Sequence, residues 1–106
     1  MPSFEEREKG FERKFEHDQE LAFKVRARRR KLLGAWAAEQ LGLAGAPAEA
    51  YASELAALGL QRGGDDEAVA KIARDFAAKG VGIDTAHIIL EAERCEREAK
   101  QQLGAG

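Results

Sequence analysis

The sequence predicts an all-α fold, a four-helix bundle preceded by a mobile or partly helical N-terminal segment. Charged residues make up 34% of the 106 positions and only two prolines occur, a composition that favours helices. Apolar residues recur at helical spacing in four stretches of the chain. The links between these stretches are short, which favours antiparallel neighbours and hence a bundle.

The first predicted helix spans roughly 12–42 and can extend back to Phe4. Apolar residues recur at helical spacing along it, at Val25, Leu32, Leu33, Trp36, Ala37 and Leu41. Gly42 and Gly45 then provide stops, because glycine accepts the left-handed backbone conformation that ends many helices.

Three shorter helices are predicted to follow, over about 47–59, 66–79 and 85–103. Asp65 and Asp84 stand before the last two, so we expect each to cap its helix by accepting hydrogen bonds from free backbone N–H groups. We also expect the aromatic side chains at helical spacing to lie in the core, with Trp36 as its central anchor. These are Phe23, Trp36 and Tyr51.

No pattern typical of a catalytic site is present, so we predict that the chain is not an enzyme and uses no cofactor. The glycines at 63–64 are followed by three acidic residues that would repel a phosphate. His87, Glu91 and Cys95 are regularly spaced, but structural zinc usually takes four Cys or His ligands, so we expect no metal site. We expect Cys95, the one cysteine, to be a small buried hydrophobe.

The N-terminal segment, residues 1–17, differs in character from the predicted bundle over 18–106. Its bulky residues have charged neighbours and would lie close to one stripe of a helix. They are Phe4, Phe11 and Phe15. Gly10 weakens such a helix by roughly 1 kcal/mol relative to alanine. We therefore expect the segment to be poorly ordered alone and to fold in a groove of a partner.

The charges are segregated, although the formal net charge is only −2. Residues 1–23 carry seven acidic and four basic side chains, whereas six of the eight residues from Lys24 to Lys31 are basic. One interpretation of this basic run is a solvated face with carboxylate partners. Docking onto a protein is the second interpretation. Nucleic-acid binding is the third, because the chain is acidic overall and no aromatic residue interrupts the run.

Four short motifs lie between Phe4 and Ala38. They read FEERE from Phe4, KFEHD from Lys14, ELAFK from Glu20 and KLLGAWAA from Lys31. In this combination the sequence resembles the zeta subunit family, the ATPase inhibitor subunits of alphaproteobacterial F-type ATP synthases. The remainder of the chain agrees with that family more loosely.

The resemblance implies an inhibitor that binds the alpha, beta and gamma subunits in the catalytic head of the synthase. Its N-terminal helix would enter an alpha/beta interface near gamma and block ATP hydrolysis, while the bundle stays outside as a stop. The resemblance assigns partner contacts to Phe4, Arg7, Glu8, Phe11, Lys14, Phe15, His17 and Asp18.

These considerations also predict where the protein acts. No apolar run typical of a signal peptide or a membrane span is present. We expect a cytoplasmic protein, peripheral to the inner membrane through the synthase, with no direct membrane insertion and no nucleic-acid partner. We expect the free protein to be a monomer.

Two positions depart from the pattern of the family and bear on inhibitory strength. Arg30 stands where that pattern has Asn, and Gly10 softens the N-terminal helix. The residues alone also leave open a small helical adaptor or nucleic-acid-binding module that uses the basic run. A nucleotide-sensing bundle is a further alternative, although no phosphate-binding loop supports it.

Overall fold

The computed structural model describes the backbone of residues 4–59 and 64–104 and the side chains of residues 19–58 and 65–104. All regular structure within these ranges is helical. The helices are α1 (Phe4–Gln40), α2 (Ala46–Gly59), α3 (Gly64–Lys79) and α4 (Thr85–Gln102). The all-α prediction is confirmed. The helices end within about two residues of their expected bounds, and α1 takes the longer form that begins at Phe4.

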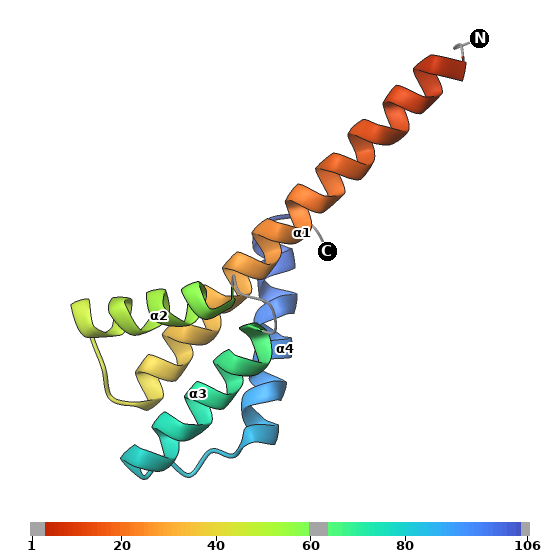
Figure 1. The fold of residues 1–106 in the computed structure, drawn as a ribbon. Coiled ribbons are helices and arrows are strands. Elements are labelled where there is room, and N and C mark those ends of the chain that lie inside the picture. The colour runs from red at the N-terminus through yellow and green to blue at the C-terminus, as the bar shows by residue number, and fades with distance from the viewer. Residues whose placement is uncertain (1–3, 60–63, 105–106) are drawn as a thin grey trace.

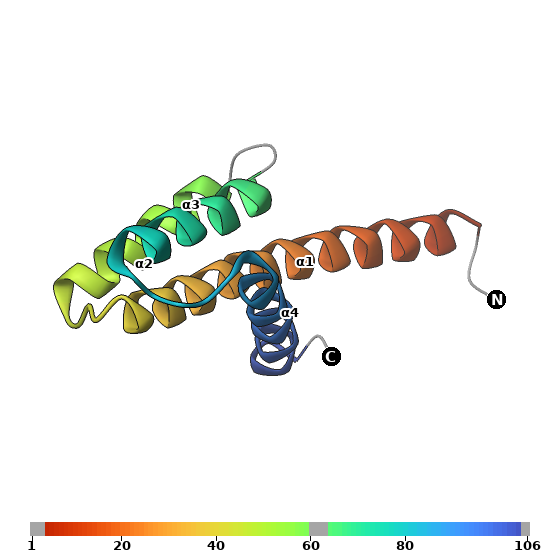
Figure 2. The same ribbon diagram turned by 90° about the horizontal axis from the view of Figure 1, so that it is seen from below.

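Only the C-terminal half of α1 takes part in the bundle (Figure 1). This half packs against α2 and α4, and α3 closes the bundle by packing against the same two helices. Figure 2 shows that α4 crosses α1 instead of lying along it. The N-terminal half of α1 projects away, so the molecule is elongated, with extents of 65 × 25 × 21 Å. We call residues 4–24 the arm and the remaining described residues the body.

The core of the body is one cluster of apolar side chains drawn from all four helices. Its largest fully buried members are Phe76, Leu55, Ile72, Ile88 and Cys95. The burial of Cys95 and Tyr51 agrees with the sequence analysis. Along α1, the first buried side chain among those described is Val25. The boundary between arm and body therefore coincides with the first described residue of α1 that is buried.

The core prediction is wrong for Phe23 and only partly confirmed for Trp36, which packs against the core cluster but is not its central anchor. Trp36 is only partly buried and presents its ring edge-on to Phe76, with ring centroids 5.7 Å apart, so Phe76 is the central anchor. Phe23 is 53% exposed. It precedes Val25 by two residues, and a turn of about 100° per residue places the two on opposite faces of α1.

Gly34 allows α1 and α2 to approach closely. A Cβ atom at this position would lie 2.7 Å from the Cα atom of Ala52. Because that neighbouring atom belongs to the backbone of α2, it cannot move aside as a flexible side chain could. The glycine in the C-terminal part of α1 is therefore a packing requirement of the body.

The links use the expected stop signals, but only one of the two predicted caps. Gly42 and Gly80 follow α1 and α3 with φ values of 78° and 73°, a region that favours glycine. Asp84 caps α4, and its Oδ1 accepts a 2.9 Å hydrogen bond from the backbone N–H of His87. The prediction that Asp65 caps α3 is wrong, because α3 already begins at Gly64.

Candidate functional site

The arm carries all eight residues to which the resemblance assigned partner contacts. They occupy positions 4–18 of α1, and their side chains lie outside the described residues. The helix backbone passes through Gly10 without a break. With a rise of about 1.5 Å per residue, residues 4–24 extend roughly 30 Å along the helix axis.

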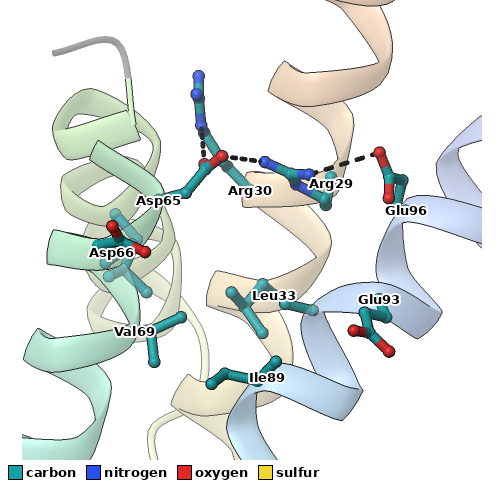
Figure 3. Close-up of a pocket in the computed structure, with 12 residues that line it drawn as sticks. Arg29, Arg30, Leu33, Asp65, Asp66, Val69, Ile89, Glu93 and Glu96 are labelled. Atoms are coloured by element: carbon teal, nitrogen blue, oxygen red, sulfur yellow. Dashed lines mark hydrogen bonds and ion pairs between the residues drawn. The ribbon is translucent and has the colours of Figure 1, made fainter. Parts of the chain in front are cut away.

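The basic run lies at the junction of arm and body, and the fold divides it between two faces of α1. Arg29 and Arg30 point into the body, where their side chains are only 17% and 12% exposed. Both contact the carboxylate of Asp65 at the start of α3, and Figure 3 shows the three side chains together. A guanidinium nitrogen of Arg29 also lies 3.5 Å from a carboxylate oxygen of Glu96 on α4. These ion pairs tie α1 to α3 and α4.

The ionisation of Asp65 is favoured by this arrangement. Burial opposes the charged form, but the hydrogen bonds and positive charges of Arg29 and Arg30 outweigh it and hold the pKa of Asp65 below its usual value. The carboxylate that was expected to cap α3 therefore serves as a tertiary link. The first interpretation of the basic run, a solvated face with carboxylate partners, is confirmed for these two arginines in the partners but not in the solvation, because both side chains are mostly buried.

A small cavity of about 230 Å³ lies beneath the ion pairs (Figure 3). Leu33 of α1, Val69 of α3 and Ile89 of α4 contribute to its apolar wall. The Asp65 carboxylate and the two guanidinium groups stand at its rim and satisfy one another. This arrangement joins three helices and leaves the positive charges of Arg29 and Arg30 neutralised from within the chain.

The opposite face of the basic run is open to solvent. Its residues line a shallow depression of about 300 Å³ together with a residue that follows α4. We call this surface the junction patch; it comprises Phe23, Lys24, Ala27, Arg28, Lys31 and Leu103. The patch combines an exposed aromatic ring with three exposed cations.

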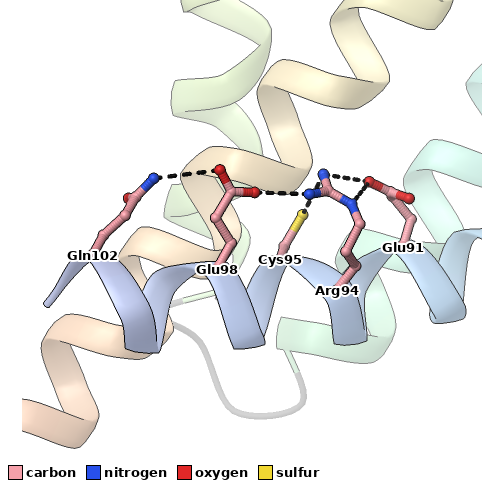
Figure 4. Close-up of polar contacts among 5 residues, drawn as sticks. All are labelled: Glu91, Arg94, Cys95, Glu98 and Gln102. Atoms are coloured by element: carbon pink, nitrogen blue, oxygen red, sulfur yellow. Dashed lines mark hydrogen bonds and ion pairs between the residues drawn. The ribbon is translucent and has the colours of Figure 1, made fainter. Parts of the chain in front are cut away.

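The remaining polar clusters join two helices of the body or lie along one of them. The hydroxyl of Tyr51 on α2 donates a 2.8 Å hydrogen bond to Asp75 on α3, and Lys71 contacts the same carboxylate. Along α4, Arg94 bonds to Glu91 and Glu98 (Figure 4). Each carboxylate has a nearby cation or hydroxyl. These groupings are typical of structural contacts between and along helices.

Neither Cys95 nor His87 forms a reactive or metal-binding site in the part of the chain that the structure describes. Burial raises the pKa of the Cys95 thiol to about 11, so the thiol is protonated and a poor nucleophile near neutral pH. The ring of His87 stacks on Trp36, with centroids 6.4 Å apart and planes inclined by 15°. No group of three His, Cys, Asp or Glu side chains there is placed to hold a metal ion.

A family model described as ATPase inhibitor subunit zeta matches residues 1–102. The chain belongs to this family. No curated protein and no solved structure matches the chain. Membership of the zeta family confirms the resemblance found in the sequence and covers both the arm and the body. It gives the chain the family role of an ATPase inhibitor subunit.

No described helix of this zeta family member is long and apolar enough to cross a membrane.

Motifs and phenylalanine spacing in the sequence indicated the arm, but the two faces of the basic run were not predicted. The signal for that separation was present, since Val25, Arg29 and Leu33 follow one another at i, i+4 spacing and so share a helix face.

Proposed function

We propose that the chain binds the catalytic head of an F-type ATP synthase and blocks ATP hydrolysis. In this proposal the N-terminal helix inserts at an interface of the alpha, beta and gamma subunits, and the body remains outside. The projecting arm of α1, in a chain of the zeta family, is the observation that carries the proposal. Residues 1–17 form the inhibitory segment and residues 18–106 the bundle.

The arm is suited to insertion because it is narrow and long. A single helix with its side chains is about 10–12 Å wide. The whole molecule is wider, with extents of 25 and 21 Å perpendicular to its long axis. A groove that accepts the arm would therefore stop the body. The described residues of the arm, 19–24, are exposed or half-buried, so packing on the body does little to hold this helix.

A partner would provide the stability that the arm lacks in isolation. Most of the stability of a helix in a protein comes from packing of one face against its neighbours, which the described residues of the arm largely lack, and Gly10 weakens this helix further. Phe4, Phe11 and Phe15 are the large apolar residues that could anchor the arm in a groove, since aromatic residues often dominate interface energetics. We propose the further contacts at the five polar positions of the same segment: Arg7, Glu8, Lys14, His17 and Asp18.

The proposal implies a cytoplasmic protein that is peripheral to the inner membrane through the synthase and monomeric when free. Binding requires no cofactor and no catalytic group on this chain. The alternative of nucleic-acid binding by the basic run is less well supported, because Arg29 and Arg30 are already paired with Asp65. This leaves fewer cations for a phosphate backbone.

ATP hydrolysis by a purified synthase head, titrated with the full-length chain, tests the proposal. We expect a saturable loss of turnover. A Phe11→Ala/Phe15→Ala variant should need on the order of a hundredfold more protein for half-inhibition, as expected for the loss of two anchors. Leu90→Ala serves as the control, because Leu90 is 62% exposed near the start of α4, whereas Leu103, which follows α4, is the residue that lies beside Phe23 of the arm.

Different outcomes of these experiments would contradict the insertion of the arm and the inhibitory function itself. Full inhibition by the double variant, at the concentration that suffices for the natural chain, would contradict insertion of the arm. Removal of residues 1–17 should abolish inhibition and leave the melting transition of the body in place. A natural chain that neither binds nor inhibits the head would reject the proposed function.

A further inference from the structure

We infer that the junction patch is a second docking surface, and that it binds an acidic surface of the synthase head beside the entry point of the arm. The inference rests on the proposed function and extends it from the arm to the body. Its basis is the division of the basic run into two faces. We call the face whose cations form ion pairs within the body the consumed face, and the face whose cations are exposed to solvent the open face.

The consumed face accounts for two of the cations in the run. Arg29 and Arg30 are both more than four-fifths buried and share the carboxylate of Asp65. Partial burial of a guanidinium group requires such a partner. The positive charges of Arg29 and Arg30 are thus explained by the stability of the body and are unavailable to an outside ligand, whereas Arg26, four positions before Arg30 on the helix, is exposed.

The positive charges on the open face are not explained by ion pairs with the body. Lys24 has a carboxylate partner in Glu20 at 3.3 Å, but both side chains are more than half exposed, and pairs of this kind contribute little. Arg28 donates to the amide oxygen of Gln102 at 3.4 Å, a neutral acceptor that leaves its charge uncompensated. Lys31 is exposed as well. The patch is therefore a net positive surface.

Phe23 supplies an apolar anchor in the middle of this charge. Phe23, Ile89 and Leu90 are the large hydrophobic side chains exposed in the described part of the chain, and Phe23 is the aromatic one. Ala27 and Leu103 line the depression beside it. An aromatic residue in a shallow apolar depression with a charged rim has the composition of a protein-binding hot spot.

The body positions part of the patch before any partner arrives. Its residues come from α1 and from the end of α4, and the hydrogen bond from Arg28 to Gln102 joins these two elements. Surfaces that are organised in advance lose less conformational entropy on binding. The three cations select a partner of negative charge, and a protein is favoured over nucleic acid because the whole chain is acidic.

The position of the patch fits a partner that also holds the arm. Lys24 lies on the same continuous helix as Phe11, roughly 20 Å further along its axis. A head that receives the arm would meet the patch at the rim of the groove. Docking there would fix the depth of insertion and add electrostatic attraction during the encounter.

Affinity measurements with the purified synthase head at about 0.1 M and 0.5 M salt test the inference on full-length variants. Lys24→Glu/Lys31→Glu should weaken binding by at least about tenfold at the lower salt concentration and by less at the higher one, because salt screens exposed charges. Phe23→Ala should weaken binding by about tenfold at both concentrations. The matched control is Arg74→Glu/Lys79→Glu, an equal change of charge at exposed positions on α3, and its affinity should stay within about twofold of the natural chain.

Each result decides between the possibilities. Equal affinity of the patch and control variants would overturn the inference while the proposed function stands. A natural chain that fails to bind the head would reject both. Binding of the natural chain to phosphatidylglycerol vesicles, lost in Lys24→Glu/Lys31→Glu while affinity for the head is kept, would overturn the inference in favour of a membrane. A dimer on a sizing column that the same variant dissociates, again with head affinity unchanged, would overturn it in favour of a second copy of the chain.

Discussion

The arm and the C-terminal half of α1 belong to one helix but depend on different interactions. From Val25 onward, the helix packs against α2 and α4 and contributes to a shared core. Before Val25, the described side chains are exposed or half-buried, and the helix relies on its backbone hydrogen bonds and on neighbouring charges. A single element can thus be a rigid part of a fold at one end and a marginal helix at the other.

The largest test of this difference compares two phenylalanines. Phe76→Ala removes a fully buried ring from the core and should lower the free energy of unfolding by about 3–5 kcal/mol. Phe23→Ala removes a ring that is 53% exposed and should change it by less than about 0.5 kcal/mol. Urea denaturation followed by circular dichroism measures both. Similar losses for the two variants would mean that the arm is part of the core.

Two glycines of α1 provide the next contrast. Gly34→Ala forces a Cβ against the backbone of Ala52 and should destabilise the body by about 1–3 kcal/mol. Gly10→Ala raises helix propensity by roughly 1 kcal/mol and should increase the helicity of the arm without lowering the melting temperature of the body. Amide hydrogen exchange of the two regions distinguishes the effects. A stabilised body in Gly34→Ala would show that α1 and α2 can separate at low cost.

Removal of the Asp84 cap of α4 tests whether the body can lose stability while the arm is unchanged. Asp84→Ala removes the acceptor for the His87 N–H and should cost about 1 kcal/mol. We expect a lower unfolding midpoint in urea and unchanged amide exchange at residues 4–24. Asp84→Asn keeps an acceptor and should recover most of the loss. Faster exchange in the arm of Asp84→Ala would indicate that the two regions unfold together.

The smallest expected effect concerns the ion pairs at the junction. Because the pKa of Asp65 is lowered in the folded state, its contribution is present above the unfolded pKa of about 4 and is lost as pH falls through the lowered value. The Asp65 side chain is 54% exposed, so Asp65→Asn should cost less than about 1 kcal/mol at pH 7. Urea denaturation at pH 7 and near pH 3 should show this difference shrinking at the lower pH. An undiminished difference would exclude ionisation of Asp65 as its cause.

Much of the fold could be predicted because its signals are local. Helix positions follow from apolar spacing, and the Asp84 cap follows from one residue standing before a strongly periodic stretch. Asp65 was misassigned because three acidic residues in succession offer several places for a helix to begin. Its actual partners, Arg29 and Arg30, lie 36 and 35 positions away in the sequence, a distance over which local rules carry no information.

The aromatic residues and the basic run show what the sequence alone left open. Phe23 is of a residue type that is common in protein cores. Whether it is buried depends on the point at which α1 leaves the bundle, and that point is set by the packing of the four helices. The basic run spreads around the helix, and only contact with α3 and α4 determines which cations are neutralised. The contacts proposed for Phe4 and the other arm residues stay predictions, since their side chains lie outside the described residues.

The continuity of α1 across Val25 has a consequence for how the length of this chain can change. Each residue added to a continuous helix turns everything beyond it by about 100° and moves it by about 1.5 Å. A single insertion between positions 18 and 24 would turn the side chains of the arm about the helix axis, so that its faces point in other directions relative to the body. An insertion of seven residues would nearly restore these directions but lengthen the arm by about 10 Å. The two regions therefore share one angular register, which makes the connecting segment intolerant of insertions and deletions even though almost nothing packs against it.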